Sequence, residues 1–142
     1  MAILTVFTPT YNRAYTLHKC YESLRRQTNK GFVWLIIDDG STDNTKELVD
    51  SWLKNDNGFE IRYAYKENGG MHTGHNKAYE LIDTELNVCI DSDDYMPDNA
   101  VESILNFWEN NRDNNYSGII ALDMFENGEI IGKKLPEQKS IT

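Results

Sequence analysis

Short apolar runs alternate along this chain with segments whose apolar residues recur every three or four positions. The clearest run, residues 32–37, is apolar throughout and stops at Asp38-Asp39-Gly40. A short apolar run bounded by turn residues is typical of a buried strand. By the same reasoning we predict strands at residues 3–8, 32–37, 59–65, 86–90 and 118–124, with an Asn127-Gly128 hairpin turn after the last.

Helical spacing fills the segments between these strands. Apolar residues spaced for one helix face predict helices around residues 17–24, 48–53, 78–82 and 101–108. We expect Ser41 or Thr42 to cap the second helix, with Asp43 in its first turn. We expect the third to begin near Gly74, and Pro97 to occupy the first position of the fourth.

The order of elements, strand and helix in alternation, predicts an α/β fold with a mostly parallel, Rossmann-like sheet and helices on both faces. We expect residues 1–132 to form one domain and residues 133–142 a loose tail. Right-handed crossovers would bring residues 9–13, 38–41 and 91–94 to one edge of the sheet.

Composition narrows the partners of this domain. The 142 residues carry a net charge of −9, which argues against nucleic acid or an anionic membrane surface. Cys20 and Cys89 lie in apolar contexts, so we expect unpaired core thiols and a reducing compartment. No apolar run is long enough to span a membrane, and the N-terminus lacks signal-peptide features, so a cytoplasmic location is expected.

The strongest candidate chemistry is Asp91-Ser92-Asp93, directly after a predicted strand. Alternate residues of an extended segment point the same way, so Asp91 and Asp93 could share one face. Two carboxylates with waters and phosphate oxygens would suit Mg²⁺ or Mn²⁺. The alternative is a solvated acidic turn in which Asp94 or Asp98 caps the next helix.

A second acidic turn, Asp38-Asp39-Gly40-Ser41, follows the second strand. A carboxylate here could accept hydrogen bonds from a nucleobase or ribose. The same residues suit a helix cap and turn equally well, so both interpretations stay open. Near the same edge, residues 8–11 offer hydroxyls and an aromatic face, or form a simple turn.

The third candidate is the glycine-rich segment 68–77. Its glycines allow a ligand close to the backbone, a helix N-terminus near Gly74 favours anions, and Lys77 adds a positive charge. The alternative is a flexible loop with incidental histidines. The spacing of a P-loop is absent, and His72 and His75 lack the further ligands of a zinc site.

Together these motifs resemble the donor-binding half of a family 2 (GT-A fold) glycosyltransferase. They occur in the order of that family, at about its spacing, between residues 3 and about 124. The matching pieces are Thr8-Pro9-Thr10-Tyr11-Asn12-Arg13, Ile36-Ile37-Asp38-Asp39-Gly40-Ser41-Thr42-Asp43, Asn68-Gly69-Gly70 with Asn76-Lys77-Ala78, and Asp91-Ser92-Asp93-Asp94 with Pro97.

The resemblance implies a UDP- or GDP-sugar donor bound through Mn²⁺ or Mg²⁺, and a saccharide or lipid-linked acceptor. It assigns Asp93 to the metal and Asp91 to the ribose or the metal's waters. It places Asp39 at the base or ribose. The full set of implied donor-binding residues is Thr8, Pro9, Tyr11, Arg13, Asp39, Asn68, Gly69, Lys77, Asp91 and Ser92.

The resemblance also implies an inverting displacement assisted by a carboxylate base. Asp123 and Glu126 come too early to match that base, so we expect it beyond Thr142, in a longer enzyme of which this chain is the N-terminal portion. The alternatives are a non-catalytic nucleotide-sugar-binding module and a phosphoacceptor receiver domain. The first strand ends in Thr8-Pro9-Thr10, where a receiver would carry an acidic pair, and a dinucleotide-binding oxidoreductase would need a glycine fingerprint there. Oligomeric state is left open.

Overall fold

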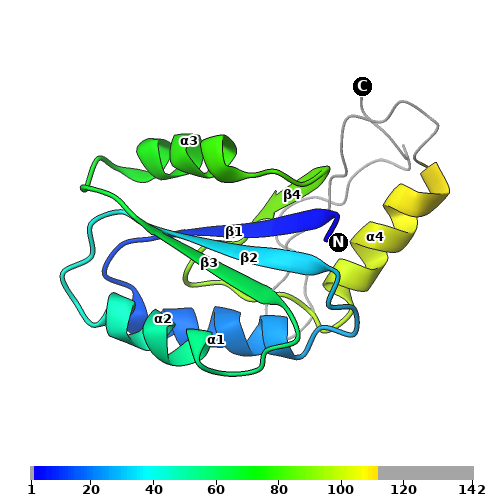
Figure 1. Cartoon of the computed structure of the whole chain (residues 1–142), viewed down its shortest axis with the longest axis horizontal. Coiled ribbons are helices and arrows are strands. Elements are labelled where there is room, and N and C mark those ends of the chain that lie inside the picture. The colour runs from blue at the N-terminus through cyan, green and yellow to red at the C-terminus, as the bar shows by residue number, and fades with distance from the viewer. Residues whose placement is uncertain (1, 112–142) are drawn as a thin grey trace, which may run out of the picture. The chain divides into compact units, whose positions relative to one another are not determined.

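Residues 2–111 are described by the computed structural model, and they follow the alternating order expected from the sequence (Figure 1). Contacts divide the chain into two units, Met1–Ser103 and Ile104–Thr142, and the architecture below concerns the first. The strands are β1 Leu4–Thr10, β2 Phe32–Asp38, β3 Glu60–Tyr65 and β4 Leu86–Cys89. The helices are α1 Ala14–Arg25, α2 Thr45–Leu53, α3 Met71–Leu81 and α4 Ala100–Asn111, the last of which crosses the division.

The four strands form one parallel sheet in the order β3-β2-β1-β4. Leu4 pairs with Phe32 on one side and Leu86 on the other, and Thr10 at the end of β1 pairs with Asp38 at the end of β2. The predicted parallel α/β sheet is therefore confirmed. Its carboxyl edge gathers the turns that follow β1, β2 and β4.

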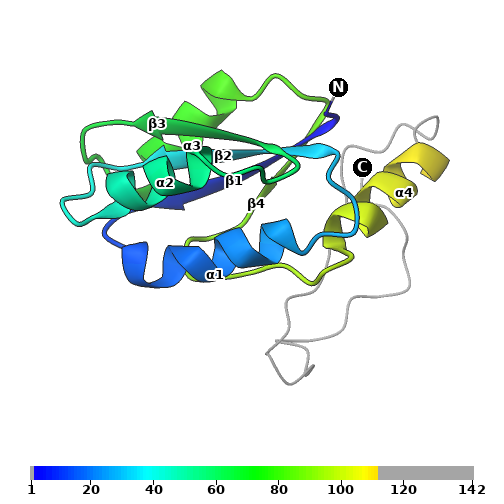
Figure 2. The same cartoon turned by 60° about the horizontal axis from the view of Figure 1, so that its bottom comes forward.

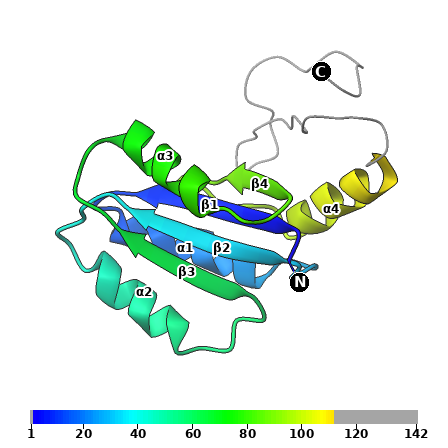
Figure 3. The same cartoon turned by 45° about the horizontal axis from the view of Figure 1, so that its top comes forward.

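Helices cover both faces of the sheet, with α1 and α2 on one side and α3 on the other (Figures 2 and 3). On the first face Tyr21 stacks on Trp52 with ring centroids 4.2 Å apart, and Trp34 lies 5.6 Å from Trp52. On the opposite face Phe7 and its neighbours in β2 pack against Ala78 of α3. The alternation of β1 and β2 side chains thus builds two cores, one on each side of the sheet.

Helix α3 begins earlier than the sequence suggested. It starts at Met71 rather than near Gly74, so residues 71–73, which were predicted to end the loop, are helical. Gly70 precedes it with φ of +96°, a left-handed conformation that glycine adopts without steric cost. The Gly70 carbonyl accepts the N–H groups of Thr73 and Gly74, which closes the first turn.

Two other helix starts differ from the prediction. Helix α2 begins at Thr45, beyond Ser41 and Thr42, and the Asp43 carboxylate accepts the Thr45 N–H at 3.1 Å. Helix α4 begins at Ala100, whose N–H bonds to the Pro97 carbonyl at 3.1 Å in a turn that precedes the helix. Both helices therefore begin a few residues later than predicted.

Both cysteines are free thiols, as predicted. Cys20 is buried, and its burial raises its pKa to about 12. Burial, together with the nearby Asp91 carboxylate, raises the pKa of half-buried Cys89 to about 12 as well. Both therefore stay protonated at neutral pH.

The strand predicted at 118–124, the hairpin turn at 127–128 and the tail at 133–142 lie outside the described residues. Within residues 2–111, the structure shows no helix with the length and apolar character needed to cross a membrane.

Candidate functional site

The site predicted from the sequence lies at the carboxyl edge of the sheet. The turn after β2 carries Asp38 and Asp39, and the turn after β4 carries Asp91, Asp93 and Asp94. Strand β1 separates the two, so their backbones are about 10 Å apart at about 4.8 Å per strand. The two acidic groups therefore lie at the same edge of the sheet, on either side of the end of β1.

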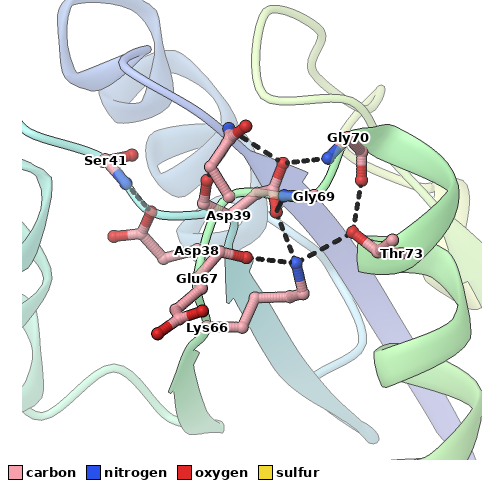
Figure 4. A network of polar contacts seen from close by, with 9 residues as sticks. Asp38, Asp39, Ser41, Lys66, Glu67, Gly69, Gly70 and Thr73 are labelled. Atoms are coloured by element: carbon pink, nitrogen blue, oxygen red, sulfur yellow. Dashed lines mark hydrogen bonds and ion pairs between the residues drawn. The ribbon is translucent and has the colours of Figure 1, made fainter.

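Asp39 lies at the centre of a hydrogen-bond network at this edge (Figure 4). Its carboxylate accepts the Lys66 ammonium at 2.6 Å, the Gly69 and Gly70 N–H groups at 3.0 Å each, and the Asn68 side-chain amide at 3.3 Å. A carboxylate offers about four acceptor positions, so these donors account for all of them. The side chain is almost fully buried as a result.

These donors also decide the charge of Asp39. Burial by itself would raise the pKa of this carboxyl, but the hydrogen bonds from Lys66 and from the Gly69 and Gly70 backbone outweigh burial and leave the pKa below its usual value. Asp39 is therefore ionised at neutral pH. In this structure it holds the segment after β3 against the end of β2.

Asp38 has a local role. Its carboxylate accepts the Ser41 N–H at 2.9 Å and the hydroxyl of Tyr63 on β3. A carboxylate that bonds to a backbone N–H three residues on stabilises a turn. For Asp38, then, the turn that the sequence left as an alternative is what the structure shows.

The turn after β1 is locked to the turn after β2 through Asn12. Asn12 has φ of +50°, and its side-chain oxygen accepts the N–H groups of Thr42 at 2.8 Å and Asp43 at 3.3 Å. Asparagine is one of the few residues that tolerates this left-handed conformation. The clasp leaves Tyr11 and Arg13, on either side of Asn12, exposed at the edge.

The acidic residues after β4 are arranged differently. Asp91, Asp93 and Asp94 are exposed, and each offers a ligand oxygen within 4.8 Å of the other two. They converge through a turn, in which the Asp94 N–H bonds to the Asp91 carbonyl at 3.0 Å, and not through the extended segment assumed from the sequence. The turn adds Asp94 to the predicted pair.

This donor set fits a hard divalent cation. Three carboxylate oxygens in one small volume suit Mg²⁺ or Mn²⁺, which prefer oxygen ligands. Ser92, between the first two aspartates, is buried, and its carbonyl accepts the Thr16 hydroxyl of α1 at 3.1 Å. The turn that carries the cluster is thereby anchored to a helix.

Comparison with known proteins identifies the family of this chain and its fold. The sequence profile described as Glycosyl transferase family 2 matches residues 5–139. This chain belongs to glycosyl transferase family 2. Among curated relatives, the family 2 chain is 32% identical over 103 residues to the glycosyltransferase GlyG of Streptococcus pneumoniae, covering 72% of this chain and 34% of GlyG. It is 33% identical over 103 residues to the chondroitin synthase of Pasteurella multocida, covering 72% of this chain and 10% of that protein.

Solved structures agree with this assignment. The crystal structure of S. aureus TarS residues 1–349 in complex with UDP superposes with a TM-score of 0.71 at 26% identity, covering 79% of this chain and 33% of that one. A TarS fragment of the same range in complex with UDP-GlcNAc matches equally well, with a TM-score of 0.71. The chain spans about a third of the length of the curated relative GlyG, at 34%.

Not every predicted donor-binding residue of the family 2 chain faces this edge. The Thr8 side chain is fully buried, and its oxygen accepts the Trp34 indole N–H at 2.9 Å. Pro9 is buried on the opposite face, 3.4 Å from where a side chain on Gly74 would begin. Both side chains therefore lie in the core, and their part in a base pocket stays a prediction.

The glycine-rich segment is divided between two settings. Asn68 and Gly69 belong to the Asp39 network, as described above. Lys77 lies on the surface of α3, with its ammonium 3.5 Å from the Glu80 carboxylate. Lys77 is therefore not part of the Asp39 network, and its contact with phosphate stays a prediction.

The sequence analysis gave no individual role to three residues that build the site. These residues are Lys66, which bonds to Asp39, Thr73, which bonds to Lys66, and Asn12, which bonds to Thr42. Their partners lie several to about thirty residues away in the chain. None stands in a periodic pattern, and each residue type is common in loops. Their position was the available signal, because Asn12 and Thr73 lie within recognised motifs and Lys66 shortly precedes one.

Proposed function

We propose that this chain supplies the donor-binding part of a metal-dependent, inverting glycosyltransferase. The observation that carries the proposal is the convergence of the Asp91, Asp93 and Asp94 carboxylates at the carboxyl end of β4 in a family 2 chain. Ligands of parallel α/β sheets bind at this edge. The TarS complexes with UDP and UDP-GlcNAc support a nucleotide-sugar donor of the UDP class, and a GDP-sugar is the alternative that the sequence resemblance implies.

The proposed site has a nucleoside end and a diphosphate end. At the nucleoside end, Tyr11 and Arg13 are exposed beside the network of Asp39, Asn68 and Gly69. An aromatic ring there offers a face for a base, and the side-chain oxygen of Asn68, whose amide nitrogen donates to Asp39, offers a hydrogen-bond acceptor. Thr8 and Pro9 contribute by fixing the end of β1, from which Tyr11 follows, through core contacts on the two faces of the sheet.

At the diphosphate end, Asp93 and Asp94 would hold Mn²⁺ or Mg²⁺, with Asp91 beside the metal or the ribose and Ser92 fixing the turn. A bound divalent cation supplies Lewis acidity that stabilises a departing nucleoside diphosphate. The net charge of −9 gives an independent reason for the metal, since an acidic edge repels a diphosphate without one.

Sugar transfer with inversion requires an acceptor hydroxyl to attack the anomeric carbon on the face opposite the leaving diphosphate. The hydroxyl proton must pass to a base as the new bond forms, and we assign that base to sequence beyond this chain. The acceptor would be a saccharide or a lipid-linked hydroxyl. A cytoplasmic location remains a prediction of the donor hypothesis.

Calorimetric titration of the chain with UDP, GDP and CDP tests this proposal, each with Mn²⁺ and with EDTA. We expect one nucleotide to bind only with the metal, and Asp93→Asn to remove that binding. Asp50→Asn, an exposed carboxylate of α2, is the matched control and should bind normally. Metal-independent binding would support a module of another kind, and no binding of any nucleotide would refute the donor site in this chain.

A further inference from the structure

Lys66 is a largely buried cation beside the candidate site. Its ammonium lies 2.6 Å from an Asp39 oxygen, 2.8 Å from the Thr73 hydroxyl and 2.5 Å from the Glu67 carbonyl (Figure 4). An ammonium has three N–H donors, and these acceptors account for all three. The side chain is 19% exposed and that of Asp39 is 7% exposed, so water screens the pair only weakly.

Lys66 and the glycine-rich segment share one anchor. The carboxylate that receives the Lys66 ammonium also receives the Gly69 and Gly70 N–H groups and the Asn68 amide. Without the lysine, that carboxylate would keep its charge in a buried place with neutral donors alone. The ion pair therefore fixes the acceptor on which the course of residues 68–70 depends.

Lys66 also reaches the start of α3. The Thr73 hydroxyl that bonds to its ammonium donates to the Gly70 carbonyl at 2.6 Å. A single cation thus connects the end of β2, the segment that follows β3, and the first turn of α3.

The packing around the ammonium leaves little freedom. A side chain on Gly69 would begin 2.9 Å from the Thr73 hydroxyl and 3.3 Å from the Lys66 ammonium. A side chain on Gly40 would begin 2.7 Å from the Asn68 backbone nitrogen. Residues 68–70 therefore pass close to the Lys66 ammonium and to the turn after β2.

We infer that Lys66 is a positioning residue of the donor site, which pairs with Asp39 to hold Asn68 and Gly69 where the nucleotide sugar binds. This inference rests on the proposed function for the identity of the ligand. Direct binding of phosphate by Lys66 is the competing role, and the geometry disfavours it because all three of its N–H groups are already used.

The test is Lys66→Met, with Lys46→Met, an exposed lysine of α2, as its matched control. Three quantities are measured on the chain: the affinity for UDP with Mn²⁺, the affinity for Mn²⁺ alone, and the hydrogen-exchange protection of the Gly69 and Gly70 amides. Loss of a hydrogen-bonded charge in Lys66→Met should weaken UDP binding about tenfold or more. Mn²⁺ affinity should stay within about twofold, because the metal cluster lies across β1. Lys66→Arg, which keeps the charge, should recover part of the loss.

Exchange separates this inference from the proposed function. We expect the Gly69 and Gly70 amides to lose protection in Lys66→Met while the amides of β1 and β2 keep theirs. Unchanged protection at both glycines overturns the inference even if no nucleotide binds to the parent chain, an outcome that would refute the proposed function separately. A parallel loss of Mn²⁺ affinity and of β1 and β2 protection also overturns it, because it indicates general destabilisation.

A second variant covers the case in which Lys66→Met does not fold. Thr73→Val removes one partner of the ammonium and leaves the pair with Asp39 intact. We expect UDP affinity to fall about threefold or more, because the variant loses the bond from the ammonium and the bond to the Gly70 carbonyl, with Mn²⁺ affinity unchanged. An unchanged UDP affinity in Thr73→Val would overturn the inference.

Discussion

Aspartates end two strands of this sheet, and their surroundings differ sharply. After β2, Asp38 and Asp39 are 1% and 5% exposed, and both bond to donors of the same chain. After β4, Asp91 and Asp93 are exposed and lie with Asp94 in one cluster of carboxylate oxygens. The fold surrounds the first pair with hydrogen-bond donors, among them the Lys66 ammonium beside Asp39. The second cluster instead brings like charges together at the surface.

The contrast shows how one residue type takes two roles at equivalent positions. A buried carboxylate surrounded by donors stabilises the loops that supply them. A cluster of exposed carboxylates gains most from an external cation. The predictions below test this division of roles, which we base on burial and donors.

The largest expected effect is from Asp39→Ala. The variant leaves the buried Lys66 ammonium without its counter-ion and removes the acceptor of Gly69 and Gly70, so the free energy of unfolding should fall by about 3–5 kcal/mol. Urea titration followed by circular dichroism measures it. Asp91→Ala is the control, with a change within about 0.5 kcal/mol. Equal losses in both variants would end the distinction between the two strand ends.

Manganese should produce the next largest effect, and through the other strand end. At a concentration a hundred times its dissociation constant, Mn²⁺ should raise the free energy of unfolding by about 2.7 kcal/mol, because it binds the folded state. EDTA should reverse the gain and Asp93→Asn should abolish it. Asp39→Asn, where it folds, should keep it. Thermal melts with and without the metal give the comparison, and a gain that survives in Asp93→Asn would place the cation elsewhere.

A smaller effect is expected at the glycine of the β2 turn. Gly40 has φ of +84°, and a methyl group there would begin 2.7 Å from the Asn68 nitrogen, so Gly40→Ala should cost about 2 kcal/mol. Gly58 has a similar φ of +80° but meets only the Lys30 side chain at 3.6 Å, so Gly58→Ala should cost about 1 kcal/mol. Chemical denaturation of both variants separates the free-energy cost of the close approach to Asn68 from the cost of backbone strain. Equal costs would show that residues 68–70 shift to make room for the methyl group.

The smallest expected effect on stability near neutral pH comes from the titration of Asp39. The pKa of Asp39 is lowered in the folded chain, so the stability it contributes is fully present above its unfolded value of about 3.9 and is lost as pH falls through the folded pKa. Between pH 5 and 8 this contribution should be constant. Asp39→Asn should therefore flatten part of the acid limb in a pH series of urea titrations, and an unaltered limb would show that Asp39 does not titrate as described.

Much of the fold followed from local pattern, because strands and helices here are written in runs of apolar residues. Residues 32–37 predicted β2 to within one residue of its end. Local pattern also brought the acidic turns to one edge, through the parallel order of the strands. Helix starts were less accurate, since Asp43 and Gly70 bond within loops whose shape the pattern does not determine.

The settings of individual site residues depended on contacts distant in sequence. The burial of Thr8 requires Trp34, and the saturation of Asp39 requires Lys66 and the glycines about thirty positions on. The local sequence around these aspartates does not show which of them will be buried. These partners can be identified only from the fold, which shows which loops lie side by side.

The ring stack of Tyr21, Trp34 and Trp52 lies on the helical face of the sheet formed by α1 and α2. Two indoles with centroids 5.6 Å apart have coupled electronic transitions, so the folded chain carries an optical signature in ultraviolet circular dichroism and fluorescence. The stack belongs to the core and not to the turns where nucleotide and metal are proposed to bind. Spectroscopy at these rings can therefore follow unfolding of the domain while ligands are varied at its edge.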